Sequence, residues 1–567
     1  MKNKKVSLTH IIYAGILILA VLLRVVNLNQ VPLDNNEATH ALCALDGNQT
    51  DCDGESRIYT FFTSIIFTIL GRNNISARII PILFGSLIVL LPLFAEPFLD
   101  RKTGVVMAFF LALDPILIQV TRSADAYIIG FVFILYVLVF ILKQEYFKGF
   151  LVFLFGLLSG VSFWVGLIIL GISFGLSQVF VQDKKKNEPD EKKPLVCPFR
   201  SLQKNKSDLL LVFILWILIS TRFLNDPSGF LAPLNSLAAL FSSMSSKAAT
   251  LPLSPKMKTI GLSFYSIFGI ILCVMALIKK SYPAMKNALF VLVWMGTAFF
   301  FFLLPSSSFF DVVWFILPMW FLASGEVVRL GEMVIRERKQ ILIPTLIGIA
   351  VLVFLSLEVV RLNYLISVGL NVYTNLIVLV VPIILFLIVI ILFGYGWSKK
   401  LALCVSAALF LVCGLFGLVR NANRAANLTG TIEHEIVRKG YFLHNADVLV
   451  DEIEQYRISH GAFPQDVHIG ISSQDQSESM QWLLQDYSVE KVSVVSESNA
   501  ADYDIFILEQ DGEQMLSGFY SQDLALKSNI RLFNEDNSGF IPAEILEWLL
   551  YRGGTLDLKS YALWFRL

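Results

Sequence analysis

A short polar stretch near the N-terminus contains residue types that move protons in enzymes. Asp34, Asn36, Glu37 and His40 follow the first apolar segment of the chain. Carboxylates and imidazoles are common general bases, and carboxylates can also hold a divalent cation. Because Asp34 and Glu37 are three residues apart, a short helix would place both on one face. A solvated polar loop is the plain alternative.

Cationic residues recur at the same predicted membrane face. Arg78 begins one apolar segment, and Arg122 and Asp125 lie in a polar cluster between two others. Cations beside carboxylates could bind a lipid phosphate while a carboxylate stays available as a base. We therefore consider Arg78 and Arg122 candidates for a phosphate, and Asp125 a candidate for an acceptor or a metal. Arginines at helix ends also reach toward lipid headgroups, which is the structural alternative.

The composition is that of a membrane protein. The 567 residues are 56% hydrophobic and only 16% charged, with a mean hydropathy of +0.67. A soluble chain of this length carries about 25% charged residues. Apolar runs long enough to cross a bilayer recur along the chain, so we predict a polytopic α-helical protein with the bilayer as partner and no nucleic acid. About thirteen spans are expected, at 9–27, 77–97, 104–120, 126–143, 148–162, 164–182, 208–224, 259–278, 286–303, 309–326, 341–361, 372–394 and 400–419.

The distribution of Lys and Arg predicts the orientation. Basic residues recur in every second short loop, beginning with Lys2, Lys4 and Lys5, and such loops face the cytoplasm. We therefore expect a plasma-membrane protein with a cytoplasmic N-terminus and an outer C-terminal domain. Four regions follow: a signal-anchor span at 1–27, a first external loop with the candidate site at 28–76, the remaining spans at 77–424, and an extracytoplasmic domain at 425–567.

The C-terminal region has the pattern of an α/β domain. Residues 421–567 contain 23 acidic and 10 basic residues, unlike the more basic remainder. Apolar periodicity predicts helices at 446–460 and 479–487 and strands at 467–471, 492–495 and 503–508. No glycine-rich phosphate loop follows the first of these strands, which argues against a nucleotide site.

Two of the six cysteines, Cys43 and Cys52, fall in the first external loop. A local disulfide between them is one reading of the pair, since the outer side of a membrane is oxidising. The other four lie mostly in apolar segments, where buried thiols are expected. No Cys-x-x-Cys pair indicates a metal or redox centre.

Three segments together resemble a known superfamily. Residues 24–42, 76–85 and 111–127 are similar to the N-terminal half of the GT-C polyprenyl-phosphate-sugar glycosyltransferases. The nearest branch is family 39, which is like the dolichyl-phosphate-mannose-protein mannosyltransferases. Within it, the chain resembles a prokaryotic group with a C-terminal extracytoplasmic domain, and residues 548–564 are similar to the end of that group.

The resemblance implies an inverting transfer of a hexosyl or pentosyl group in the cell envelope. A loop carboxylate would take the acceptor proton, the acceptor would attack C1 of the sugar, and polyprenyl phosphate would leave. Cationic or metal groups would stabilise the departing phosphate, so a divalent cation is an open alternative. The acceptor could be a glycan, a lipid or a protein.

The chain departs from the family pattern at three places. Asn36 occupies the position of the expected catalytic Asp, and an amide cannot act as a general base. Asp125 lies three residues after Arg122, where related chains often have about five. Relatives often carry a Lys or Arg near the position of Pro305, and residues 304–308 have none.

These observations lead to one prediction with two alternatives. We predict a membrane glycosyltransferase in which Glu37 is the first candidate base and Asp34 the second, while Asp125 and His40 contact the acceptor or a metal. The first alternative is a catalytically impaired relative that binds a lipid-linked glycan or serves as a scaffold. A transporter is less well supported, because no matched pair of Gly- or Pro-interrupted spans is present.

Overall fold

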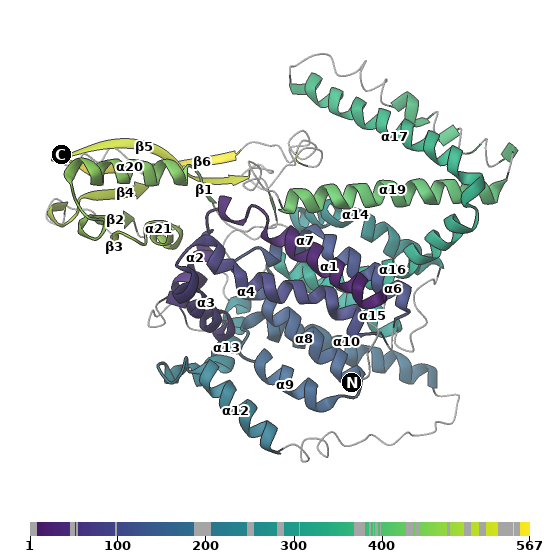
Figure 1. The fold of residues 1–567 in the computed structure, drawn as a ribbon, viewed down its shortest axis with the longest axis horizontal. Helices are drawn as coiled ribbons and strands as arrows, with labels where there is room; N and C mark the ends of the chain where they lie inside the picture. The colour runs from purple at the N-terminus through teal and green to yellow at the C-terminus, as the bar shows by residue number, and fades with distance from the viewer. Residues whose placement is uncertain are drawn as a thin grey trace.

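The computed structural model is a body of long helices with one mixed sheet toward the C-terminus (Figure 1). The described residues are 8–45, 52, 55–96, 99–185, 206–245, 255–279, 288–304, 307–367, 380–384, 387–388, 391, 395–396, 398–426, 435–436, 442–472, 477–492, 500–509, 517–530, 548 and 556–567.

The first half of the chain forms a series of packed helices. In chain order they are α1 (Leu8–Val25), η1 (Leu28–Gln30), α2 (Asn35–Leu45), α3 (Arg57–Leu70), α4 (Asn74–Leu87), η3 (Ile88–Leu90), α5 (Leu91–Phe94), α6 (Arg101–Leu113), α7 (Pro115–Thr121), α8 (Tyr127–Leu142), α9 (Tyr146–Gly156), α10 (Val161–Lys185) and α12 (Lys206–Ser220).

The second half of the body continues this pattern. Its elements are η4 (Pro227–Leu231), α13 (Ala232–Ser245), α14 (Pro255–Lys279), α15 (Ala288–Leu303), η5 (Phe309–Val312), α16 (Val313–Arg336), α17 (Arg338–Ser367) and α19 (Lys399–Ala426).

The helices confirm a multi-pass membrane protein. Seven helices of the described part are long and apolar enough to cross a bilayer, or eight if the bent pair α6 and α7 is one span. Further apolar helices, among them α8, α9 and α15, are shorter. The number thirteen therefore stays a prediction, and most of the predicted span at 372–394 lies outside the described residues.

Helix α16 is the central element of the body. In its most apolar window 72% of the residues are buried, against 11% for α17, which lies at the periphery. Trp314 and Trp320 of α16 are fully buried. Trp320 stacks on Phe110 of α6, with ring centroids 4.7 Å apart, so large aromatic side chains fill the contact between these helices.

The span predicted at 104–120 is broken. Helices α6 and α7 meet at Asp114 with a bend of 58°. Asp114 has an extended backbone, and its side chain accepts a hydrogen bond from the Leu117 amide, which caps α7. Pro115 favours the first position of a helix but cannot continue one, because it lacks an N–H group. Hydropathy cannot detect this break, since both helices are apolar.

Much of the region 28–76 is helical instead of a simple loop. It contains η1, α2 and α3. Residues 57–70 form the apolar helix α3, which begins after the cap Ser56: the Ser56 side chain accepts a hydrogen bond from the Tyr59 amide. The Cys43–Cys52 disulfide is present and joins α2 to the segment that precedes α3.

The C-terminal region is an α/β domain, as predicted. Its elements are β1 (Phe442–Leu443), α20 (Ala446–His460), η7 (Pro464–Asp466), β2 (His468–Ser472), α21 (Ser477–Leu483), β3 (Ser488–Val492), η8 (Ala500–Asp502), β4 (Ile505–Glu509), β5 (Phe519–Ile530) and β6 (Leu556–Arg566). The strand order is β1-β5-β6-β4-β2-β3. Strand β2 is parallel to β3 and β4, and the other pairs are antiparallel.

One prediction for this domain needs correction: the helix expected at 479–487 is Ser477–Leu483. Strand β3 is described at Ser488–Val492, and residues 493–495 of the strand expected at 492–495 lie outside the described residues. The long antiparallel strands β5 and β6 were not predicted at all. Tyr561, Leu563 and Phe565 alternate with more exposed residues on β6, and they pack in the same core as α20. That alternation was the readable signal.

Candidate functional site

A polar cavity lies where helix α2, the connection between α7 and α8, and the start of η5 meet. Its volume is about 270 Å³. Three aspartates, one amide and several hydroxyl groups line it, together with apolar side chains. The lining residues are Asp34, Asn36, Ser123, Asp125, Tyr127, Val161, Val165, Leu240, Phe301, Ser307, Ser308, Phe310 and Asp311.

The first role of Asp34 and Glu37 is to cap the start of helix α2. The Asp34 carboxylate accepts a hydrogen bond from the Glu37 amide at 2.9 Å, and the Glu37 carboxylate accepts one from the Asp34 amide at 3.1 Å. This reciprocal pair is a capping box, which satisfies two backbone donors at the start of α2. The spacing that suggested shared chemistry is therefore also the spacing that begins this helix.

Glu37 joins three elements in the interior. Its carboxylate accepts two hydrogen bonds from the Arg78 guanidinium of α4, at 3.1 and 2.7 Å, and one from the Ala124 amide at 2.7 Å. The Glu37 side chain is 1% exposed and that of Arg78 is fully buried. Arg78 also donates to the carbonyls of residues 28, 31 and 32. The pair therefore fixes α2 and α4 against the α7–α8 connection.

Arg122 is held in the same manner. Its guanidinium donates to the carbonyls of Arg24 and Val26, at 3.0 and 2.7 Å, where α1 ends. Neither Arg78 nor Arg122 is among the residues that line the cavity. Both arginines therefore bind protein partners: Arg122 at the end of α1 and Arg78 beside α2. Neither has a position in the cavity from which to bind a donor phosphate.

Asp125 is the carboxylate that other groups hold from two sides. One oxygen accepts a hydrogen bond from the Tyr127 amide at 2.8 Å, and His40 Nε2 lies 3.7 Å from the same oxygen. Burial raises the pKa of Asp125 above its usual value, although the nearby His40 charge opposes the change. A carboxyl with a raised pKa is a better general base near neutral pH.

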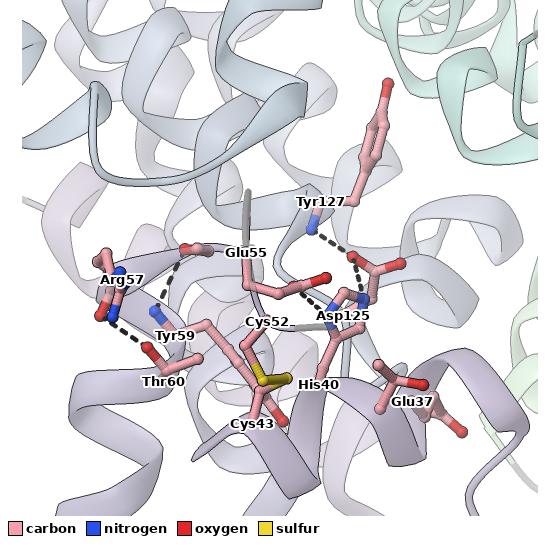
Figure 2. A network of polar contacts seen from close by, with 12 residues as sticks. Glu37, His40, Cys43, Cys52, Glu55, Arg57, Tyr59, Thr60, Asp125 and Tyr127 are labelled. Carbon is pink, nitrogen blue, oxygen red and sulfur yellow. Dashed lines mark hydrogen bonds and ion pairs between the residues drawn. A yellow bond between two sulfur atoms is a disulfide. The ribbon is translucent and has the colours of Figure 1, made fainter. Parts of the chain in front are cut away.

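His40 lies between two carboxylates, as Figure 2 shows. Its Nδ1 atom pairs with Glu55, and its Nε2 atom faces Asp125. Burial alone would lower the pKa of His40, but the charges of Glu55 and Asp125 raise it to about 10. His40 is therefore an imidazolium at neutral pH, and it brings a positive charge to the edge of the cavity.

The disulfide holds this arrangement at its outer end. Cys43 is on α2, one turn after His40, and Cys52 lies three residues before Glu55 (Figure 2). The Cα atoms of the two cysteines are 5.7 Å apart. Glu55 thus faces His40 because a covalent bond keeps its segment against α2. The sequence identified the two cysteines but gave no reason to connect them with His40.

Asp311 and Tyr127 form a second polar group in the cavity that sequence reasoning missed. Tyr127 O–H donates to the Asp311 carboxylate, and the Trp314 indole N–H donates to the Tyr127 oxygen at 2.9 Å. Asp311 also accepts from the Ser308 amide at 2.7 Å, within the capping box of η5. Its signal was the Ser-x-x-Asp spacing just before an apolar helix.

A buried lysine supplies a cation near Pro305. Lys258 of α14 is 1% exposed. Its ammonium donates to the carbonyls of Leu304 and Ser307 at 2.9 Å each, and to the Ser307 hydroxyl at 2.6 Å. Ser307 itself lines the cavity. Residues 304–308 contain no cation in the sequence, and the one that contacts Leu304 and Ser307 comes from another helix.

The described residues offer no ready cation site. Within them, no group of three or more His, Cys, Asp or Glu side chains is arranged to hold a metal ion. Asp34, Asp125 and Asp311 share the cavity without forming such a group. A role for a divalent cation therefore stays a prediction.

Comparison of the structure with solved structures identifies the fold. ArnT from Cupriavidus metallidurans, crystallised with undecaprenyl phosphate, aligns with a TM-score of 0.52 at 13% identity, over 88% of this chain and 93% of that chain. The chain has a GT-C fold.

Two further GT-C structures align less closely. The apo form of the same ArnT gives a TM-score of 0.49 at 12% identity, over 88% of this chain and 93% of that chain. An Archaeoglobus fulgidus oligosaccharyltransferase gives a TM-score of 0.28 at 12% identity, over 88% of this chain and 68% of that chain. No family model and no curated protein matches the sequence. At these identities the GT-C likeness describes the fold alone, and the family 39 branch stays a prediction.

Proposed function

We propose that this GT-C chain transfers a sugar from a polyprenyl-phosphate donor to an acceptor on the outer side of the membrane. The observation that carries the proposal is the polar cavity of about 270 Å³, in which Asp34, Asp125 and Asp311 meet the hydroxyls of Ser123 and Tyr127. Convergent carboxylates and hydroxyls suit the hydrogen bonding of a sugar. The ArnT structure with undecaprenyl phosphate supports a polyprenyl phosphate as the donor lipid.

We assign the general base to Asp125. Its raised pKa favours proton uptake, and His40 and the Tyr127 amide fix its orientation. In the proposed step the acceptor O–H gives its proton to Asp125 while its oxygen attacks C1 of the sugar. The bond between C1 and the phosphate oxygen breaks, and its electron pair leaves with polyprenyl phosphate.

Glu37, the first candidate from the sequence, is less suited to this role. Its carboxylate already accepts hydrogen bonds from Arg78 and from two backbone amides. A base must reach the proton it removes, and Glu37 is not among the residues that line the cavity. Asp34 lines the cavity and remains the second candidate, although it uses one oxygen to cap α2.

Like Arg78 and Arg122, Lys258 does not line the cavity, so its charge acts on the departing phosphate through Ser307, which Lys258 contacts and which does line the cavity. Polyprenyl phosphate gains negative charge as it leaves, and a fixed cation in a buried site stabilises that charge. The Lys258 ammonium donates to the carbonyl and hydroxyl oxygens of Ser307. His40 adds a second positive charge, beside Asp125.

The experiment is a transfer assay in nanodiscs with a panel of undecaprenyl-phosphate sugars, measuring the release of undecaprenyl phosphate. Turnover by the wild type is expected, with a loss of about 10²- to 10⁴-fold in Asp125→Asn. Asp34→Asn is the matched comparison from the same cavity, and a larger loss there would transfer the base to Asp34.

The rival function is a relative that binds the lipid phosphate without turnover. Asn36 favours it, because this amide lines the cavity where the family pattern has a carboxylate. The same assay separates the two. Binding of undecaprenyl phosphate by a wild type without turnover, together with turnover by Asn36→Asp, would support the rival function. Absence of both binding and turnover would refute both functions.

A further inference from the structure

The C-terminal domain contacts the membrane body on the helix that carries the cavity residues. Helix α21 lies side by side with α2 in Figure 1. Trp482 of α21 is 3% exposed and belongs to the hydrophobic core of the membrane body, not to that of its own domain. An aromatic side chain of one domain that is buried in the core of another indicates a specific interface between the two.

Trp482 is fixed by both a ring contact and a hydrogen bond. Its ring lies against Phe67 of α3, with centroids 5.6 Å apart, and its indole N–H donates to the Asn74 side-chain oxygen at 2.8 Å. Asn74 is the first residue of α4, the helix that contributes Arg78. A single tryptophan therefore contacts two of the helices that surround α2.

The direct contact with α2 is made by Asn35. Its side-chain oxygen accepts a hydrogen bond from the Ser479 amide of α21 at 3.2 Å. Asn35 also hydrogen-bonds the Glu478 carboxylate, which pairs with Lys491 of β3 at 2.8 Å. Burial alone would raise the pKa of Glu478, but the hydrogen bonds from Lys491 and Asn35 lower it below its usual value. The carboxylate is therefore charged at neutral pH.

The position of Asn35 gives these contacts their significance. Asn35 is the first residue of α2 and stands between Asp34 and Asn36, which both line the cavity. The Asn35 side chain points to the C-terminal domain, while Asp34 and Asn36 line the cavity. A shift of this turn would move both neighbours together, because they share its backbone.

We propose that the C-terminal domain positions the cavity wall through α21, with Asn35 and Trp482 as positioning residues for the transfer reaction. The proposal rests on the proposed function for its kinetic consequence. Its structural consequence does not depend on turnover, because it concerns the order of α2 itself. Since a displacement of about 1 Å in a site can cost about 10²-fold in rate, a loosened α2 would lower kcat.

The first measurement is hydrogen exchange on the full chain in nanodiscs. In Trp482→Ala, the amides of residues 35–45 should exchange at least about 10-fold faster than in the wild type, while those of α16 stay unchanged. Trp482→Phe, which keeps an aromatic ring against Phe67, should give exchange rates between those of the wild type and Trp482→Ala, and it guards against a folding failure. Gln485→Ala is the matched control, because Gln485 donates to the carbonyl of Arg72, a residue outside α2.

The second measurement is the kinetics of Asn35→Ala. We expect kcat to fall about 10-fold or more while KM for the undecaprenyl-phosphate sugar changes less than about 2-fold. Glu478→Gln should keep most of the rate, because an amide oxygen can still accept from Asn35. Gln485→Ala should match the wild type.

The outcomes separate this proposal from the proposed function. Unchanged exchange over residues 35–45 in Trp482→Ala would overturn the positioning role, whatever the activity. Faster exchange with unchanged kcat in an active enzyme would overturn it as well. A wild type without turnover would refute the proposed transfer, and the exchange result alone would then decide whether α21 orders α2.

Discussion

At the scale of single residues, one motif turned out to serve two purposes. The polar stretch from Asp34 to His40 contains groups that hold the surrounding helices together and groups that line the cavity. Glu37 is a structural carboxylate in the ion pair with Arg78, while Asn36 and Asp34 line the cavity. Sequence proximity had suggested one shared role for all of them.

The ion pair makes a prediction about stability. Glu37→Gln should lower the free energy of unfolding by about 3–5 kcal/mol, because Arg78 would keep a buried charge without its partner. Thermal unfolding in nanodiscs measures this. Asp125→Asn is the matched control, expected to lose activity and keep its unfolding temperature. A stable Glu37→Gln protein with no turnover would instead return the catalytic role to Glu37.

His40 makes a prediction about pH. Because its pKa rises from 6.5 to about 10 on folding, His40 stabilises the folded state fully below pH 6.5, and this contribution is lost as the pH rises through about 10. The unfolding temperature of the wild type should therefore fall between pH 7 and pH 10.5. His40→Gln should show a smaller fall over the same range. Identical pH profiles would show that His40 is not held between Glu55 and Asp125.

At the scale of elements, helix caps and one covalent bond decide where the site residues lie. Capping boxes begin α2 and η5, and Asp114 caps α7 at a sharp bend. Each cap satisfies backbone donors that would otherwise be unpaired at a buried helix end. The same aspartates and glutamates therefore start the helices and determine which side chains reach the cavity.

The disulfide makes a prediction at this scale. Replacing both cysteines, Cys43→Ser with Cys52→Ser, should release Glu55 from His40 and lower the pKa of His40 from about 10 toward 6.5. NMR titration of labelled histidines measures the pKa. Glu55→Gln, which keeps the disulfide, should give a similar shift.

The same pair should also affect stability. Loss of a disulfide typically costs about 2–4 kcal/mol, so the double variant should unfold at a lower temperature than Glu55→Gln. An unchanged His40 pKa in the double variant would mean that the bond stabilises α2 without positioning Glu55.

At the scale of the whole molecule, two tryptophans attach the C-terminal domain to the membrane body. Trp482 contacts α3 and α4, and Trp548 packs against Phe264 and Tyr265 of α14, with ring centroids 6.3 and 6.1 Å apart. Both belong to the core of the body. The domain is thus held at two places, on α14 and beside α2.

Trp548 makes the prediction for this scale. Trp548→Ala should cost about 3–5 kcal/mol at its buried contact, and limited proteolysis should release the C-terminal domain sooner than from the wild type. Phe463→Ala is the control, because this aromatic residue of the same domain is 74% exposed. Equal release rates from the two variants would show that Trp548 does not anchor the domain.

The sequence by itself determined the class of the molecule. Long apolar runs require a helical membrane body, and the acidic region with alternating helix and strand patterns indicated an α/β domain. Both follow from local composition and periodicity. The sequence left a disulfide between Cys43 and Cys52, nine positions apart, as one reading of the pair, and the structure shows it. The candidate residues of the cavity, Asp34, Asn36 and Asp125, were also named from the sequence.

Only the tertiary structure decided what each residue touches. Lys258 reaches the segment near Pro305 from another helix, Asp311 meets Tyr127 across 184 residues, and Asn35 meets Ser479 across 444. Local patterns cannot specify such pairs, because they arise from the packing of distant helices. Glu37, the first candidate base from the sequence, is the ion-pair partner of the buried Arg78 in the structure. This pairing also depends on tertiary packing, because a buried charge must be paired to offset its desolvation.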